Sequence, residues 1–114
     1  GRGFVELVES DRESTPEAEQ AVRDAVAVML EHGADQIVLG CTHYPFLLPV
    51  LERVVAGRGV EIVDPSPAVA RRVVQLLDRY GLHVDPAHRA EYTFRTFADE
   101  AYRLRLERKA LGAL

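Results

Sequence analysis

Short apolar runs rich in β-forming residues alternate along this chain with segments of helical periodicity. The clearest run lies in residues 36–40, where Ile-Val-Leu shows no apolar–polar alternation, as is typical of a strand buried on both faces. Residues 4–9 (FVELVE) and 60–64 (VEIVD) predict two further strands, and residues 91–96 predict a weaker one. Strands alternating with helices predict a parallel sheet covered on both faces, a three-layer α/β/α fold that is only partial here.

The segments between these runs carry helix start and stop signals. Ser14 and Glu17 have capping-box spacing, Pro16 fits the first turn, and Gly33 is placed to end that helix in the left-handed conformation. Similar signals predict three further helices: one opened by Pro45, one capped by Ser66 and ended by Gly81, and one over residues 99–109.

Composition excludes several classes of protein. The chain has 114 residues, 47% of them hydrophobic, a net charge of −4 and one cysteine. No apolar run approaches the ~20 residues of a transmembrane helix, and the start of the chain lacks the pattern of a signal peptide. The acidic balance argues against a nucleic-acid partner, and one cysteine excludes an internal disulfide framework or a cysteine zinc cage. We therefore expect a cytoplasmic α/β chain with no membrane contact.

The most informative motif follows the strand in residues 36–40, at the edge of the sheet where α/β proteins bind ligands. This motif, GCTHYP, places Cys41 before a helix whose N-terminus would stabilise a thiolate. His43 can exchange protons with the sulfur or a substrate, and Thr42 can donate to a carboxylate. The pattern favours acid–base or nucleophilic cysteine chemistry. The alternative is that Cys41 is a small buried hydrophobe and His43 an ordinary loop residue.

The segment that contains this motif, DQIVLGCTHYPFLLPVLERV in residues 35–54, resembles the second cysteine motif of glutamate racemases, members of the aspartate/glutamate racemase family. FVELVE is similar to a strand of that family, with Glu6 where proline is usual. VEIVDPSPAVARRV in residues 60–73 is similar to its next strand, acidic turn and helix. His43 makes the resemblance specific, because related aspartate racemases usually carry glutamate there. The similarity covers nearly the whole chain, but only the C-terminal half of the family.

The resemblance implies a reaction and a set of residues. Glutamate racemases interconvert L- and D-glutamate for peptidoglycan synthesis without cofactor or metal, using two cysteines that flank the substrate α-carbon. By resemblance, Cys41 is the second of these cysteines, His43 assists it, Glu9 supports the same side of the site, and Thr42 contacts the substrate. The full-length form is expected to be a homodimer.

The chain also departs from the family pattern. The Asp-Ser pair, the Pro-Tyr-Gly stretch and the C-N-T motif with the first cysteine do not occur. We therefore expect residues 1–82 to be the C-terminal part of the second α/β domain. Residues 83–114 would be a connector and a strand–helix segment that returns to the first domain. With Cys41 alone the two-base reaction cannot be completed, so the chain by itself is expected to be inactive.

Two other functions stay open at this point. The chain could be a non-catalytic α/β interaction or dimerisation module derived from a racemase. It could also be a single-cysteine hydrolase or transferase of unrelated type.

Overall fold

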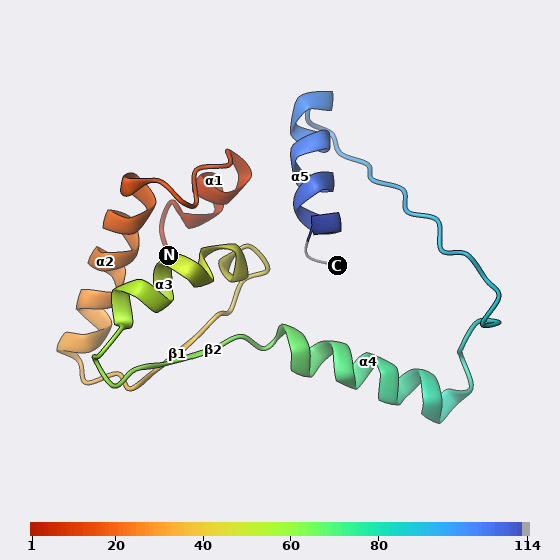
Figure 1. The fold of residues 1–114 in the computed structure, drawn as a ribbon, viewed down its shortest axis with the longest axis horizontal. Coiled ribbons are helices and arrows are strands. Elements are labelled where there is room, and N and C mark those ends of the chain that lie inside the picture. Colours follow the sequence, from red (N-terminus) through yellow and green to blue (C-terminus); the bar gives the residue numbers. More distant parts are fainter. Residues whose placement is uncertain (113–114) are drawn as a thin grey trace. The chain divides into compact units, whose positions relative to one another are not determined.

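The structure, a computed structural model, describes residues 1–112. The chain divides into two compact units, residues 1–64 (unit 1) and residues 65–114 (unit 2). Unit 1 contains six elements: α1 (Phe4–Glu9), α2 (Pro16–Glu31), β1 (Gln36–Val38), the 3-10 helix η1 (Tyr44–Leu47), α3 (Leu48–Val55) and β2 (Glu61–Val63). The elements described in unit 2 are α4 (Ser66–Tyr80) and α5 (Glu100–Gly112) (Figure 1).

The two strands of unit 1 form a small parallel sheet (Figure 1). Ile37 of β1 lies opposite Ile62 of β2, and the Leu39 N–H extends the pairing by donating to the Val63 carbonyl at 3.0 Å. The chain crosses from the end of β1 to the start of β2 through η1 and α3, as a parallel pair requires. The fold class is mixed α/β, and the predicted parallel pairing is confirmed.

The sheet is covered differently on its two faces. Successive residues of a strand point to opposite faces. In β1, Ile37 is 7% exposed, whereas its neighbour Val38 is 62% exposed. Within unit 1 the helices therefore cover one face of the sheet, and the expectation of a strand buried on both faces is not met there.

The core of unit 1 lies on the covered face, between the sheet and the helices. Each helix contributes apolar residues at helical spacing, as Val22 and Val26 do from α2. The buried residues are Phe4, Leu7, Val8, Ala18, Val22, Val26, Ile37, Leu39, Leu47, Val50, Leu51, Val54 and Val55.

The predicted strand over residues 4–9 is wrong, because this segment forms helix α1. Phe4, Leu7 and Val8 are buried while Glu6 is exposed, which is burial at helical spacing. The β-rich composition of FVELVE suggested a strand, but its apolar residues do not alternate with polar ones. The periodicity of the segment was the better guide.

The N-cap of helix α2 lies one residue later than predicted. Thr15, rather than Ser14, is the N-cap, and its Oγ1 accepts a hydrogen bond from the Ala18 N–H at 3.3 Å. Pro16 takes the first helical position, which it suits because it has no N–H to leave unpaired. The predicted end is confirmed, since Gly33 follows the helix with a φ of 77°.

In unit 2, two predicted helices are confirmed and two details of the prediction are wrong. Helix α4 starts at Ser66, with Pro65 as its N-cap and no side-chain capping bond. The predicted Ser66 cap is therefore wrong. Gly81 ends the helix with a φ of 61°, as expected. Residues 91–96 form no strand. A strand requires a partner for its backbone hydrogen bonds, and the described part of unit 2 contains only helices.

Among residues 1–112, no helix combines the length and the apolar character needed to cross a bilayer. The domain boundary between residues 82 and 83 stays a prediction.

The core predicts how the chain responds to truncation of a buried side chain. Leu47 is fully buried at the start of the crossover, so Leu47→Ala should lower the free energy of unfolding by about 2 to 5 kcal/mol. Urea titration followed by circular dichroism measures this change. Val28→Ala, at a 56% exposed position of α2, is the control and should stay within about 0.5 kcal/mol of the parent. Equal losses in the two variants would contradict this core.

Candidate active site

Cys41 lies at the carboxyl end of β1, where the chain leaves the sheet and turns into η1. Leu39 still pairs with the end of β2, so Cys41 emerges at the edge of the sheet that also carries Asp64. The Cys41 carbonyl accepts a hydrogen bond from the Tyr44 N–H at 3.1 Å. This turn leaves the Cys41 side chain partly buried, at the position where ligands bind in parallel sheets.

Three of the predicted site residues meet at this edge. His43 Nδ1 lies 3.8 Å from Cys41 Sγ, and His43 Nε2 lies 3.2 Å from Glu9 Oε1. The side chains of His43 and Glu9 are 27% and 30% exposed. Residues 34 apart in the sequence are thus brought together, with α1 supplying the carboxylate and the turn before η1 supplying the imidazole.

These two contacts indicate which ring nitrogen of His43 carries the hydrogen. A carboxylate at Nε2 favours the tautomer with its hydrogen on Nε2, which leaves Nδ1 as an acceptor facing the Cys41 thiol. In this geometry His43 can accept the thiol proton, and Glu9 would stabilise the imidazolium that results, as the third member of a catalytic triad does. The separation of 3.8 Å is long for this transfer, but catalytic contacts often tighten only when a substrate is bound.

The thiolate was also expected to be stabilised by a helix N-terminus, and the structure corrects that expectation. The helix that follows Cys41 is the four-residue η1. The Tyr44 N–H donates to the Cys41 carbonyl, and the Phe46 N–H donates to the His43 carbonyl at 3.2 Å. These donors are occupied by carbonyl groups, so the polar partner of the sulfur is His43.

The remaining predictions for this site concern Thr42 and metals. Thr42 lies between Cys41 and His43 and is exposed; its contact with a substrate carboxylate stays a prediction. Within residues 1–112, no three His, Cys, Asp or Glu side chains are grouped as a metal site would require.

The end of α1 holds Glu9 by a backbone motif that sequence reasoning missed. Asp11 adopts a left-handed φ of 56°. Its N–H donates to the Val8 carbonyl at 3.2 Å, and the Arg12 N–H donates to the Leu7 carbonyl at 2.8 Å. This pair of bonds is a Schellman motif, which usually has glycine at the left-handed position. Asp11 gave no such signal in the sequence.

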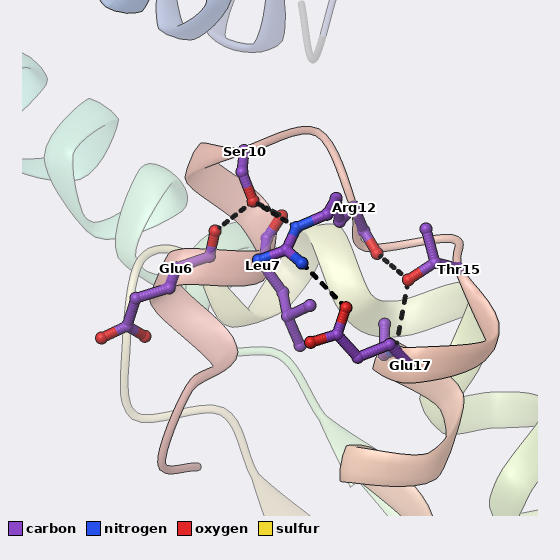
Figure 2. Close-up of polar contacts among 7 residues, drawn as sticks. Glu6, Leu7, Ser10, Arg12, Thr15 and Glu17 are labelled. Atoms are coloured by element: carbon purple, nitrogen blue, oxygen red, sulfur yellow. Dashed lines mark hydrogen bonds and ion pairs between the residues drawn. The ribbon is translucent and has the colours of Figure 1, made fainter.

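Side chains on either side of this turn join α1 to α2 (Figure 2). Arg12 Nε donates to Ser10 Oγ at 2.9 Å, and Arg12 Nη1 donates to Glu17 Oε2 at 2.8 Å. Thr15 Oγ1 donates to the Arg12 carbonyl at 2.7 Å. We call Ser10, Arg12, Thr15 and Glu17 the α1–α2 clamp. The sequence suggested only a polar loop here, because charged residues between two elements are usually solvated.

The left-handed residue that ends α1 gives a test of this local structure. Asp11→Val and Asp11→Gly both remove the carboxylate, but only valine has a Cβ that disfavours the left-handed conformation. Asp11→Val should therefore be less stable than Asp11→Gly by about 1 to 2 kcal/mol. Thermal unfolding of the two variants measures the difference. Equal stability of the two would contradict the left-handed end of α1.

Residues 2–73 match the family model described as Asp/Glu/Hydantoin racemase. The chain is 48% identical over 80 residues to a glutamate racemase of Roseiflexus sp. (strain RS-1), covering 70% of this chain and 29% of that protein. It is 41% identical over 99 residues to a glutamate racemase of Deinococcus radiodurans, covering 87% and 34%.

A solved structure shows a similar fold. The crystal structure of glutamate racemase from Thermus thermophilus in complex with β-chloro-D-alanine matches with a TM-score of 0.69 and 33% sequence identity. The match covers 93% of this chain and 40% of that one. The chain thus spans about a third of the length of the curated relatives that it matches.

Proposed function

This chain belongs to the Asp/Glu/hydantoin racemase family, and we propose that it supplies one of the two acid–base cysteines of a glutamate racemase. The observation that carries the proposal is the contact chain from Cys41 through His43 to Glu9. The relatives named glutamate racemase support the choice of substrate. The β-chloro-D-alanine in the Thermus thermophilus racemase complex supports an amino-acid ligand.

In the proposed reaction, His43 first accepts the thiol proton and leaves Cys41 as a thiolate. The thiolate takes the α-proton of L-glutamate, and the electron pair of the broken C–H bond moves toward the substrate carboxylate. A second acid on the opposite face then returns a proton to the α-carbon, which inverts its configuration. In the reverse direction Cys41 is the acid that completes L-glutamate. A thiol suits both roles, because its proton affinity can be matched to neutral pH.

The proposal explains why the chain alone should be inactive. Cys41 is its single cysteine, so the acid on the opposite face has to come from elsewhere. The exposed fractions of His43 and Glu9 also leave water at the site, whereas stabilising a carbanion requires a dry, preorganised environment. In a complete racemase, the rest of the protein would supply both the second acid and the water-excluding environment. Thr42 would bind the substrate carboxylate there.

The proposal extends to the setting of the enzyme. It acts without a cofactor, as a homodimer in the cytoplasm, and its D-glutamate is used for peptidoglycan synthesis. These statements rest on the resemblance of GCTHYP and its flanking segments to glutamate racemases.

A chimera tests the function. The segment of the Roseiflexus racemase that aligns with this chain is replaced by the corresponding residues of this chain. The chimera should racemise glutamate, measured by circular dichroism and by α-proton exchange in D₂O. Cys41→Ser should reduce kcat by at least about 10²-fold, because it removes the acid–base group from one face. Glu9→Gln should also reduce kcat, whereas Glu52→Gln, at an exposed position of α3, should not.

Two results would overturn the proposal. One is a Cys41→Ser chimera as active as the unsubstituted chimera, and the other is a folded chimera with no glutamate exchange. The chain alone should exchange no α-proton above the rate of the buffer, and measurable exchange by the chain alone would contradict the need for a second cysteine.

A further inference from the structure

Arg12 is the member of the α1–α2 clamp with the most connections. Its guanidinium reaches back to Ser10, next to the end of α1, and forward to Glu17, in the first turn of α2. Figure 2 shows both arms leaving the same side chain. Because a guanidinium is planar and rigid, its two arms also set the separation of the groups that they bind.

The arm that binds Ser10 ends on a group that is itself held in place. Ser10 Oγ donates to the Glu6 carbonyl at 2.6 Å, so it belongs to the last turn of α1. On the other side, Thr15 accepts the Ala18 N–H and donates to the Arg12 carbonyl, which ties the backbone of Arg12 to the start of α2. The clamp therefore connects the ends of two helices through hydrogen-bonded atoms at every step.

The group whose position depends on this connection is Glu9. It is the last residue of α1 and directly precedes Ser10. Leu7 and Val8 pack the last turn of α1 into the core, whereas Glu9, which follows them, is partly exposed and leads directly into the turn that the clamp holds. The hydrogen bond from His43 Nε2 to Glu9 Oε1 is 3.2 Å long, so a small rotation of that turn would break it.

We propose that Arg12 is a positioning residue, which holds the Glu9 carboxylate against His43 and so sets the readiness of Cys41 to ionise. This inference rests on the proposed role of Cys41 as an acid–base group. It adds Arg12 to the site, although Arg12 is not a catalytic residue because it reaches the sulfur only through Ser10, Glu9 and His43.

The single cysteine of this chain gives a direct measurement. Only a thiolate reacts rapidly with iodoacetamide, so the alkylation rate of Cys41 against pH reports its ionisation. The titratable side chains with described contacts leading to the sulfur are His43 and, from α1, Glu9. Asp64 follows β2 at the same edge of the sheet, and the Tyr44 hydroxyl from η1 bonds to the Gly1 carbonyl. Glu9→Gln should slow the alkylation of Cys41 at neutral pH by about threefold, because the imidazolium loses its carboxylate partner.

Arg12→Met should also slow the alkylation of Cys41 at neutral pH, by a smaller factor than Glu9→Gln, since the carboxylate remains but is no longer held in place. Arg23→Met is the matched control. Arg23 is 47% exposed against 48% for Arg12, and it also pairs with a glutamate of α2, Glu19. Its hydrogen bond lowers the pKa of Glu19, so this pair is formed at the neutral and alkaline pH of the assay. The control should leave the alkylation profile unchanged.

Two further variants separate positioning from charge and from folding. Arg12→Lys keeps the charge but cannot bridge Ser10 and Glu17 with a fork, so it should resemble Arg12→Met. In a Glu9→Gln background, Arg12→Met should cause no further slowing, because the group that it positions is already lost. If Arg12→Met lowers the unfolding transition too far for the assay, Glu17→Met removes the acceptor of one arm and should give the smaller effect.

The proposal is overturned by any of three results: an Arg12→Met profile identical to that of the parent, an equal slowing in Arg23→Met, or a slowing by Arg12→Met that persists in the Glu9→Gln background. A parent-like profile for Arg12→Lys would also overturn it. The assay contains no glutamate, so its outcome is independent of racemisation by the chimera.

Discussion

The parallel pairing of β1 with β2 is the constraint from which the arrangement of this chain follows. Two parallel strands start at the same end, so the chain must return from the end of the first to the start of the second. Here η1 and α3 make that return, and GCTHYP is its first segment. Cys41 therefore emerges at the carboxyl edge of the sheet, and the turn that carries it also brings His43 within reach of Glu9 at the end of α1.

The sequence predicted the elements that have strong local signals. The apolar centre of residues 36–40, the glycines that end α2 and α4, and the crossover after Pro45 all correspond to observed features. At the start of the chain, two local patterns were misleading because the position of each residue mattered more than its type. FVELVE is rich in β-formers, but its apolar residues fall at helical spacing. Ser14 completes a capping pattern, but Pro16 occupies the first helical position and makes Thr15 the cap.

The site was predictable only in part, for a different physical reason. Cys41 and His43 lie two residues apart, so local spacing was enough to pair them. Glu9 lies 34 residues from His43, and no local pattern can reveal a contact that depends on how α1 packs; a family resemblance supplied it. Arg12 had neither signal, because a charged residue in a polar loop looks the same whether it is solvated or holds two helix ends together.

The two-stranded sheet has a consequence for the behaviour of the chain in solution. In the described residues no third strand pairs with β1 or β2, so each of them is an edge strand with one row of unpaired backbone groups. Such edges attract strands of other molecules. Their shortness and the polar side chains of Gln36 and Glu61 at their starts limit that tendency, whereas the exposed Val38 favours it. At high concentration, self-association of the chain is expected to begin at these edges.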